Sequence, residues 1–186
     1  MNKLSLDVRS SAEWLKAGKI LIHPTESIWG LGCDAFNIKS VNKIFELKKR
    51  DKKKNFILLA DSIDTVEKSL CNLSIKDRDV LSKYWPGPYT FLIRYHNNIP
   101  DHLKNETEKI AVRVSNHLPI INLFKGFSGI MVSTSANISG EENINNPNEI
   151  VDIFEHHELA YYDESLGVNK KPSQIIDLET KAIVRA

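Results

Sequence analysis

The sequence has few of the residues that bind structural metals. Its 186 residues include two cysteines, Cys33 and Cys71, which lie far apart and form no CxxC pair. The six histidines show no HExxH or comparable ligand spacing. These absences argue against zinc fingers and zinc ribbons. Two isolated thiols fit a reducing compartment, and we expect both to be buried as small hydrophobic side chains.

Long hydrophobic runs are also missing. No stretch approaches the ~18 apolar residues of a membrane span. The N-terminal segment MNKLSLDVRSS is too polar to be the apolar region of a signal peptide. We therefore expect a cytoplasmic protein that makes no contact with a membrane.

Neither sign of charge dominates the chain, whose formal net charge is +1. The sequence therefore lacks the overall basic character of many nucleic-acid-binding domains. The basic residues are nevertheless clustered, since six of the seven residues from Lys48 to Lys54 are lysine or arginine. They are Lys48, Lys49, Arg50, Lys52, Lys53 and Lys54. Such a local positive pole favours an anionic ligand.

No internal repeat, low-complexity tract or long linker interrupts the chain, so we predict one domain over residues 1–186. Hydrophobic residues make up 41% of the sequence, which is enough for a core. Predicted helices and strands are mixed throughout, which indicates an α/β fold with a twisted, mixed sheet and flanking helices. The predicted strands are Lys19–His23, Phe56–Ala60, Tyr89–Tyr95, Ile110–Val114, Ile130–Ser133, Leu159–Tyr162, Gln174–Leu178 and Ala182–Arg185. The predicted helices are one capped by Ser10 or Ser11, then Ile38–Lys49, Ser62–Leu70, Ser74–Tyr84, Leu118–Lys125 and one that starts at Asn146 and Pro147. The polar segment Glu164–Pro172 is predicted to be a mobile loop.

One motif resembles a dinucleotide-binding fingerprint but does not fit its context. Gly30-Leu31-Gly32-Cys33-Asp34-Ala35 matches GxGxx[GA]. That fingerprint needs its first glycine directly after a strand, with a helix opening there. Here Thr25–Trp29 intervene and the next helix begins near Ile38, so we reject a Rossmann site. The two glycines instead predict a close approach of the backbone to a ligand or to another strand.

Three polar features could bind an anionic substrate, and each also has a purely structural interpretation. Lys48 and Arg50 form a KxR pair at a predicted helix end, where a solvated basic terminus would serve the helix dipole equally well. The run Ser133–Gly140 places hydroxyls and an amide at the end of an apolar strand, either facing a ligand crevice or forming a capped turn. Arg113 lies inside an apolar strand, where its charge must pair, face a cavity or point to water from an edge.

Taken together, the motifs resemble the YrdC/TsaC family of threonylcarbamoyl-AMP synthases. The matching segments are PTESIWGLGCDA (Pro24–Ala35), ELKKR (Glu46–Arg50), WPGPYTF (Trp85–Phe91), IAVRV (Ile110–Val114), STSANISG (Ser133–Gly140), PSQIID (Pro172–Asp177) and IVR (Ile183–Arg185). The resemblance covers the chain from about Gly18 onward and implies the short bacterial form. The sequence departs from the family at four positions. Asp51 and Ser115 stand where the family commonly has proline. Ser27 replaces the common threonine, and Trp29 replaces the common tyrosine or phenylalanine. The shape of the loop after Arg50 therefore cannot be taken from the family.

The resemblance implies a YrdC-like fold with a positively lined concave cavity. It implies a nucleotidyltransferase that converts L-threonine, bicarbonate and ATP into threonylcarbamoyl-adenylate and pyrophosphate. A separate transferase complex then passes the threonylcarbamoyl group to tRNA, and weak binding of tRNA is compatible with this role. Mg²⁺ is expected with ATP, held mainly by the phosphates, with no metal ligands from the protein.

The resemblance also assigns residues to roles. The expected catalytic residues are Lys48, Arg50, Ser135 and Asn137. These four, with Lys54, Thr90, Ser133 and Arg185, are expected to bind ATP. Thr25, Arg113 and Ser173 are expected to bind threonine, with Arg113 on its carboxylate. No Ser, Cys or Thr nucleophile is expected, because nucleotidyl transfer depends mainly on positioning and electrostatics.

Two other functions compete with this one. The basic cluster is compatible with an RNA-binding or ribosome-associated module that uses the basic cavity. Such a module does not need the hydroxyl and amide groups of Ser133–Asn137, and usually has a higher net positive charge. The related carbamoyl-transfer domain of hydrogenase maturation proteins is disfavoured, because this chain lacks the cysteine pairs and the length of those proteins.

Overall fold

A computed structural model describes residues 4–52, 54–154, 158–169 and 171–186, so Lys53 of the basic cluster and Lys170 of the predicted loop lie outside the described residues. The strands are β1 (Ser5–Leu6), β2 (Ile20–Pro24), β3 (Trp29–Asp34), β4 (Ile57–Ala60), β5 (Tyr89–Arg94), β6 (Lys109–Val114), β7 (Met131–Ser135), β8 (Leu159–Tyr162), β9 (Gln174–Asp177) and β10 (Ile183–Arg185). Within the described residues they form one sheet in the order β1-β8-β2-β3-β7-β4-β6-β5-β9-β10. Parallel pairs such as β4–β6 and antiparallel pairs such as β5–β6 both occur. The predicted α/β class with a mixed sheet is confirmed.

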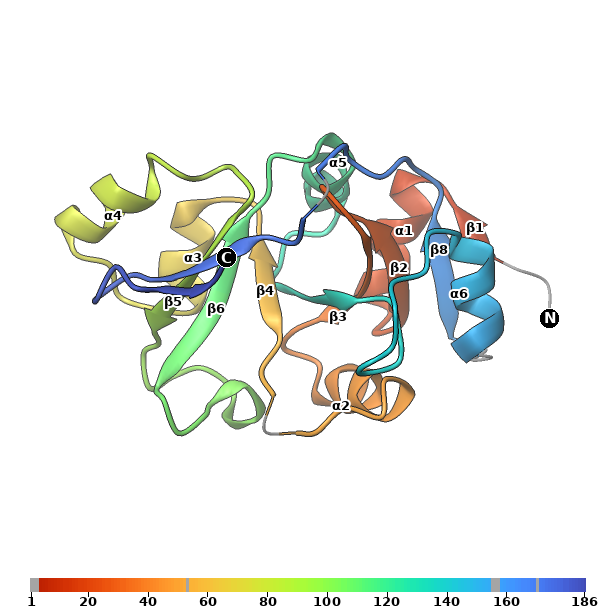
Figure 1. The fold of residues 1–186 in the computed structure, drawn as a ribbon, viewed down its shortest axis with the longest axis horizontal. Helices are drawn as coiled ribbons and strands as arrows, with labels where there is room; N and C mark the ends of the chain where they lie inside the picture. Colours follow the sequence, from red (N-terminus) through yellow and green to blue (C-terminus); the bar gives the residue numbers. More distant parts are fainter. Residues whose placement is uncertain (1–3, 53, 155–157, 170) are drawn as a thin grey trace.

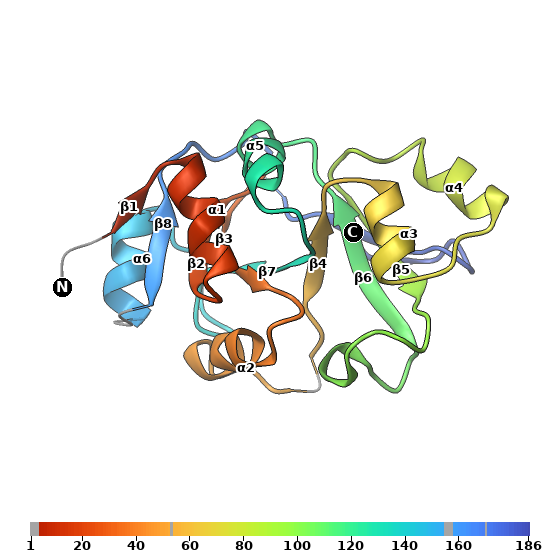
Figure 2. The same cartoon turned by 180° about the vertical axis from the view of Figure 1, so that it is seen from behind.

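The helices flank this sheet. They are α1 (Val8–Lys16), α2 (Ile38–Leu47), α3 (Ile63–Ser69), α4 (Ile75–Leu81), α5 (Leu118–Gly126) and α6 (Pro147–Phe154), with a 3-10 turn at Asp101–Leu103. Figures 1 and 2 show α3 and α4 at one end of the molecule and α1, α6 and β1 at the other. In both views α5 and α2 lie on opposite sides of the central strands. None of the helices in the described part of the chain is long and apolar enough to cross a bilayer.

Two hydrophobic cores cover opposite faces of the sheet. Ile44 of α2 packs in the larger core with Leu58 of β4, together with residues of α3, α4 and α6. Leu123 of α5 packs in the smaller core with Leu59 of β4, together with residues of α1. Leu58 and Leu59 are neighbours in one strand, so their side chains point to opposite faces. The smaller core occupies only part of its face, which leaves other strand side chains of that face free to line a cavity.

Both cysteines are buried, as predicted. The side chains of Cys33 and Cys71 are fully enclosed in the larger core. Burial raises the pKa of the Cys71 thiol to about 12 and raises that of Cys33 as well. Both thiols therefore stay protonated at neutral pH and behave as small hydrophobic groups.

The strand β3 was not among the predicted strands. It lies between β2 and β7 and pairs antiparallel with both. Its two glycines weaken the sequence signal for a strand, but pairing on both sides supplies the backbone hydrogen bonds that stabilise it. No helix opens at Gly30, and α2 begins only at Ile38. The rejection of a dinucleotide fingerprint is thereby confirmed.

The glycines of β3 make room for the ring of His23. A Cβ on Gly30 would lie 2.6 Å from His23 Cε1, and one on Gly32 would lie 2.9 Å from His23 Cδ2. His23 is fully buried, and burial lowers its pKa to about 4. The predicted close approach of this backbone is confirmed: the approaching group belongs to the neighbouring strand.

Helix starts follow the local sequence with one exception. The α1 helix begins at Val8, earlier than predicted, because the Asp7 carboxylate accepts a 2.7 Å hydrogen bond from Ser10 N. The predicted cap at Ser10 or Ser11 is therefore wrong. Ser74 and Asp77 form the predicted reciprocal capping box of α4.

The end of α2 sets the geometry of the KxR segment. Lys49 N donates to Glu46 O at 3.0 Å and Arg50 N donates to Phe45 O at 2.9 Å. These two bonds define a Schellman motif, whose C′ residue adopts a left-handed backbone conformation. Here that residue is Lys49, with φ of 48°. A lysine stands in a position that favours glycine.

Replacing Lys49 with glycine is expected to stabilise the protein by about 1 kcal/mol, because glycine adopts positive φ without steric cost. For a chain of this size the melting temperature should rise by roughly 2–4 °C. The matched control is Lys43→Gly within α2, which should destabilise by roughly 0.5–1 kcal/mol. Thermal unfolding measures both, and a loss of stability in Lys49→Gly would contradict the strain at this position.

Candidate active site

A cavity of about 410 Å³ opens over the face of the sheet that α1 and α5 leave uncovered. Three arginines line it: Arg50, Arg113 and Arg185. None of the described residues that line the cavity is aspartate or glutamate. The other lining residues are Thr25, Ser27, Ile28, Trp29, Gly30, Asn55, Phe56, Ile57, Leu92, Ala111, Ser133, Thr134, Ser135, Asn143, Pro172, Ser173 and Ile175. The predicted positively lined concave cavity is present.

Strand register brings distant polar residues to this face. On β7, Ser133 and Ser135 lie two residues apart and so point to the same side of the sheet. Ser133 lies opposite Ile57 of β4, which in turn lies opposite Ala111 of β6. Arg113 stands two residues beyond Ala111 on the same side of β6. The sheet therefore forms a floor with hydroxyls at one end and a guanidinium at the other.

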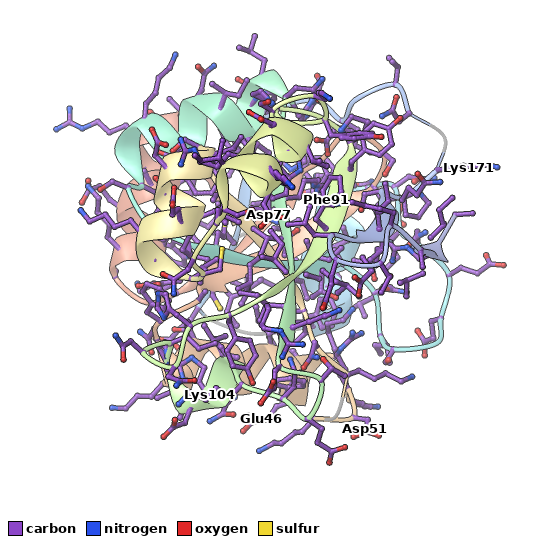
Figure 3. The ribbon with its side chains drawn as sticks, turned by 90° about the vertical axis from the view of Figure 1, so that its left-hand side faces the viewer. Glu46, Asp51, Asp77, Phe91, Lys104 and Lys171 are labelled. Carbon is purple, nitrogen blue, oxygen red and sulfur yellow. The ribbon has the colours of Figure 1, made fainter. Side chains whose placement is uncertain are left out.

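Arg50 reaches the cavity from the loop that follows α2. Its Nε donates to Lys54 O at 3.1 Å and its Nη2 to Asn55 O at 2.8 Å. The guanidinium also lies 5.1 Å from the centre of the Phe56 ring. Burial lowers the pKa of Arg50, although an arginine stays protonated. The loop after Arg50, which begins at Asp51 at the periphery of the molecule (Figure 3), is thus folded around the guanidinium.

Lys48 lies behind the cavity wall instead of lining it. Its side chain is 1% exposed, and its Nζ donates to Ser135 O at 2.5 Å, to Asn137 O at 2.6 Å and to Asn137 Oδ1 at 3.2 Å. Burial, and next the charge of Arg50, lowers the pKa of Lys48 to about 8. All three N–H groups of the ammonium are used by the protein. In this arrangement Lys48 fixes the Ser135–Asn137 turn and has no donor left for a phosphate.

Asn137 is also held by the protein. Its Oδ1 accepts a 2.6 Å hydrogen bond from Ser135 Oγ, and its Nδ2 donates to Glu141 O at 2.5 Å. Asn137 is buried, whereas Ser135 is half-buried and lines the cavity. The turn therefore presents Ser135 to a ligand and keeps Asn137 beneath it.

The C-terminal strands supply a second polar group. Arg185 of β10 donates from Nη2 to Ser173 O at 2.7 Å and from Nε to the same oxygen at 3.2 Å. Ser173 Oγ lies 2.8 Å from Thr90 Oγ1, and Thr90 itself is fully buried. Burial lowers the pKa of Arg185. Ser173 and Arg185 line the cavity, and Thr90 supports Ser173 from below.

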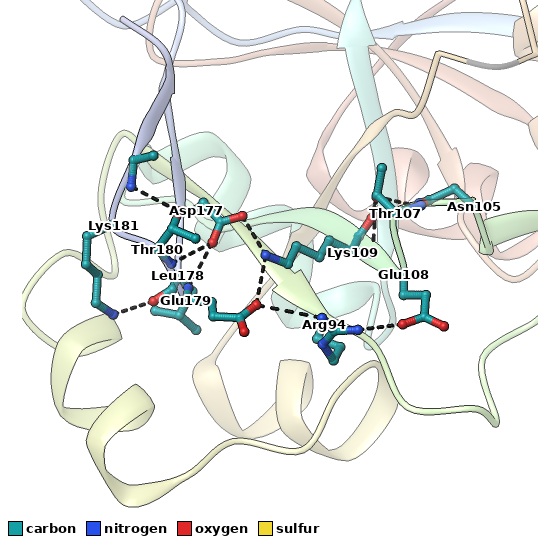
Figure 4. A network of polar contacts seen from close by, with 11 residues as sticks. Arg94, Asn105, Thr107, Glu108, Lys109, Asp177, Leu178, Glu179, Thr180 and Lys181 are labelled. Atoms are coloured by element: carbon teal, nitrogen blue, oxygen red, sulfur yellow. Dashed lines mark hydrogen bonds and ion pairs between the residues drawn. The ribbon is translucent and has the colours of Figure 1, made fainter.

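Ion pairs anchor these C-terminal strands to the sheet (Figure 4). Lys109 of β6 pairs with Asp177 of β9 at 2.7 Å and with Glu179 of the following turn at 3.0 Å. Glu179 also pairs with Arg94 of β5 at 3.7 Å. These four residues do not line the cavity and belong to strands β5, β6 and β9 and to the turn after β9. They fix the β9–β10 hairpin, whose second strand carries Arg185.

Arg113 and Thr25 form the remaining wall. Arg113 is 6% exposed, and its Nη1 lies 3.2 Å from Glu26 Oε2 in a buried ion pair. Burial lowers the pKa of Arg113, and the Glu26 charge opposes that shift. Thr25 Oγ1 donates to Ile28 O at 2.7 Å and accepts from Ser27 N at 3.3 Å. The Thr25 hydroxyl therefore holds a turn at the edge of the cavity.

The structure brings most of the predicted site residues together. Those that line the cavity are Thr25, Arg50, Arg113, Ser133, Ser135, Ser173 and Arg185. Lys48, Asn137 and Thr90 lie one layer behind it, and Lys54 is exposed and does not line it. Direct contact of Lys48, Asn137, Thr90 and Lys54 with ATP is therefore not what this geometry indicates. The reason is that buried hydrogen bonds hold the first three, whereas Lys54 contributes its carbonyl oxygen to Arg50.

Sequence reasoning missed Glu26, the buried partner of Arg113. It also missed Phe56, a second aromatic side chain that lines the cavity in addition to Trp29. Trp29 Nε1 donates to Asn145 O at 3.0 Å, which fixes its ring. An arginine inside an apolar strand needs a paired carboxylate if it is buried. Glu26, next to the predicted site residue Thr25, could have been considered as that partner of Arg113.

The arrangement can bind an extended anion but offers no activated nucleophile. Three guanidinium groups around one cavity suit phosphates and carboxylates, which they can bind through paired hydrogen bonds. The volume falls within the range typical of small-molecule sites, about 300–1,000 Å³. No group of three or more His, Cys, Asp or Glu side chains that could hold a metal exists in the described part of the chain.

Known proteins resemble this chain over almost its whole length. The Sua5_yciO_yrdC family model, described as telomere recombination, matches residues 13–186. A protein from Acinetobacter baumannii named threonylcarbamoyl-AMP synthase is 36% identical over 188 residues, which cover 98% of this chain and 99% of the relative. One of the same name from Saccharophagus degradans is 38% identical over 172 residues, covering 92% and 90%. The crystal structure of P. abyssi Sua5 complexed with L-threonine has a TM-score of 0.84 at 24% identity, over 96% of this chain and 55% of that one. That structure supports the fold.

Proposed function

Because this chain belongs to the Sua5/YciO/YrdC family, we infer that it is an enzyme that forms threonylcarbamoyl-AMP. The reaction joins L-threonine, bicarbonate and ATP and releases pyrophosphate, which makes the enzyme a nucleotidyltransferase. The product serves the threonylcarbamoyladenosine modification of tRNA. The observation that supports this function most directly is the convergence of Arg50, Arg113 and Arg185 on one small cavity without a lining carboxylate.

The chemistry explains why arginines should dominate the site. A carbamate formed on the amine of threonine must approach the α-phosphate of ATP, and both groups are anions. Their repulsion is the main barrier that a protein can lower, and fixed cations lower it without reorganising during the reaction. Arg50 lies beside the hydroxyl floor formed by Ser133 and Ser135, where we place the phosphates. Arg113 lies at the far end, where we place the threonine carboxylate.

We propose that the residues behind the wall act by holding other groups in place, although the resemblance led us to expect that they bind ATP directly. Lys48 and Asn137 hold the turn that presents Ser135, and Thr90 holds Ser173. Arg185 contributes positive charge beside Ser173. Lys54 lies outside the cavity and adds positive charge near its entrance. These are positioning and electrostatic roles, which suit a reaction that needs little covalent help from the protein.

The proposed reaction also involves a metal ion that arrives with ATP and a separate complex that uses the product. Mg²⁺ would enter with ATP and be held by phosphate oxygens and water, as this cation prefers. It would neutralise phosphate charge, while the arginines orient the anions. We propose a cytoplasmic location and a downstream transferase complex that consumes the adenylate. Any binding of tRNA is expected to be weak.

The function is tested by the dependence of pyrophosphate release on each substrate. Purified protein should release pyrophosphate from ATP only when L-threonine and bicarbonate are both present, because the adenylate cannot form without the carbamate. The measurement is coupled detection of pyrophosphate together with chromatographic identification of the adenylate. Serine and glycine in place of threonine are the controls.

Two outcomes would contradict the proposal. Equal release with serine or glycine would refute the specificity for threonine. A folded protein that releases no pyrophosphate but binds RNA tightly at high salt would favour the RNA-binding alternative. RNA binding that depends only on phosphate contacts weakens steeply as the salt concentration rises. ATP should compete with the RNA for the same cavity.

A further inference from the structure

Arg113 has a buried Nε–H without an acceptor. Its Nη1 lies 3.2 Å from Glu26 Oε2 in an ion pair, but among the described residues neither that oxygen nor the Nε of Arg113 has a hydrogen-bond partner. The residue is 6% exposed, so bulk water does little to satisfy this donor. A buried N–H without an acceptor is unfavourable, and an acceptor brought by a ligand would complete it. The orientation of the guanidinium therefore decides whether the Nε–H of Arg113 can donate a hydrogen bond to a substrate.

Glu26 is the group that sets this orientation. Its side chain is buried, and it is not among the residues that line the cavity, whereas Arg113 is. Its second carboxylate oxygen, Oε1, accepts a 2.6 Å hydrogen bond from Ser115 Oγ. Ser115 Oγ accepts in turn from His117 N at 3.1 Å. A hydroxyl has one proton to donate, so that of Ser115 is committed to Glu26.

The backbone around Glu26 is fixed as well. Glu26 O accepts from Asn169 N at 2.9 Å, and Thr25 O accepts from Gly167 N at 2.9 Å. A Cβ on Gly167 would lie 2.6 Å from Glu26 O, so only glycine permits this approach. His117 Nε2 lies 3.0 Å from Ser165 O and must be the donor, because a carbonyl only accepts. Glu26 is thus held from its backbone and from its carboxylate.

We propose that Glu26 and Ser115 are positioning residues of the amino-acid subsite. They hold the Arg113 guanidinium in one rotation and leave its Nε–H for the α-carboxylate of the substrate. The inference rests on the proposed function, because it takes the ligand of Arg113 to be an amino acid. Neither residue touches the substrate, and both act through Arg113.

A simpler role for Glu26 predicts the opposite result. If Glu26 only balanced the charge of Arg113, its carboxylate would repel the carboxylate of the substrate. Removing the charge in Glu26→Gln would then strengthen binding of threonine. If Glu26 positions Arg113, the same substitution loosens the guanidinium and weakens binding. The two roles are separated by the sign of the change in KM for threonine.

The experiment compares Glu26→Gln, Ser115→Ala and Ser115→Thr with the wild type in steady-state synthesis of the adenylate. We expect Glu26→Gln to raise KM for threonine about tenfold or more, since the substitution removes the buried ion pair that orients the guanidinium. Ser115→Ala should raise it roughly threefold to tenfold, and Ser115→Thr should restore it because the hydroxyl returns. KM for ATP should change less than about twofold in all three, because we place the phosphates at the other end of the cavity. Ser82→Ala, at the distant end of α4, is the control.

Each result is decisive. An unchanged or lower KM for threonine in Ser115→Ala, with wild-type kinetics for ATP, would overturn the inference while leaving the proposed function intact. Should Glu26→Gln fail to fold, as circular dichroism would reveal, Ser115→Ala and its threonine rescue decide alone. Equal increases of both KM values in Ser115→Ala would indicate a structural role and would also overturn it. A wild-type protein that forms no adenylate would refute the proposed function itself.

Discussion

Replacing Arg50 with alanine is expected to lower adenylate synthesis roughly a hundredfold or more. An arginine that bridges two anions in a preorganised site contributes on the order of 3 kcal/mol to transition-state stabilisation. Arg50 lines the cavity, and its guanidinium is fixed by the carbonyls of Lys54 and Asn55 and by the Phe56 ring. The substitution therefore removes the charge and releases the loop that holds it. Steady-state kinetics of pyrophosphate release measures the effect.

Two variants test whether the effect belongs to the guanidinium. Arg50→Lys should restore only part of the activity, because lysine keeps the charge but cannot donate to both carbonyls from one plane. Lys49→Ala, whose side chain is exposed at the same helix end, should leave synthesis nearly intact. The melting temperature of Arg50→Ala should fall only slightly, since the lost hydrogen bonds are near the surface. Equal small losses of activity in Arg50→Ala and Lys49→Ala would mean that the KxR pair is only a solvated helix end.

Replacing Lys48 with methionine is expected to impair both stability and synthesis. The change leaves the carbonyls of Ser135 and Asn137 without their buried donor, at about 1–3 kcal/mol for each. Part of this cost is offset because the charge no longer has to be buried. The turn that presents Ser135 should loosen, and a displacement of about 1 Å in such a site can cost a hundredfold in rate. Lys43→Met, at a half-buried position of the same helix where only a surface ion pair with Glu46 is lost, should change both properties little.

The pH dependence of Lys48 gives an independent check. Burial lowers its pKa to about 8 in the folded protein, from 10.5. Between these values the unfolded chain holds more protons, so the contribution of Lys48 to stability rises with pH across that window. Synthesis should fall above pH 8, because a neutral amine has two N–H groups for three acceptors. Wild-type stability measured relative to Lys48→Met should increase from pH 8 to 10.5, and a decrease would contradict the shift.

The sequence predicted the fold where local patterns are strong. The apolar run Phe56–Ala60 corresponds to β4 within one residue, and the capping sequence of Ser74 with Asp77 marks the start of α4, although this helix ends three residues before the predicted Tyr84. The strand β3 was missed because its glycines give no strand pattern, and its stability comes from two neighbouring strands distant in the sequence. Local propensity could not reveal this tertiary pairing.

The sequence identified which polar residues gather at the candidate site, but not which of their side chains reach the cavity. Motifs identified Lys48, Asn137 and Thr90 as polar residues of the site, yet their side chains lie behind the cavity wall. A sequence does not state which way a side chain points at a helix end or in a turn. Glu26 was missed for a related reason, because Arg113 of β6 pairs with it only after the segment between β2 and β3 packs against that strand.

The packing of His23 against β3 has an evolutionary consequence. The imidazole fills the space that side chains at positions 30 and 32 would occupy. A large ring at 23 therefore requires glycine at both positions. A Cβ at position 32 would also lie 2.9 Å from the backbone oxygen of Val132, so only position 30 can accept a side chain once position 23 becomes small. Across relatives positions 23 and 30 should covary, with the substitution at 23 arising first, whereas position 32 should stay glycine. The order follows from sterics, since the reverse sequence passes through an intermediate with overlapping atoms.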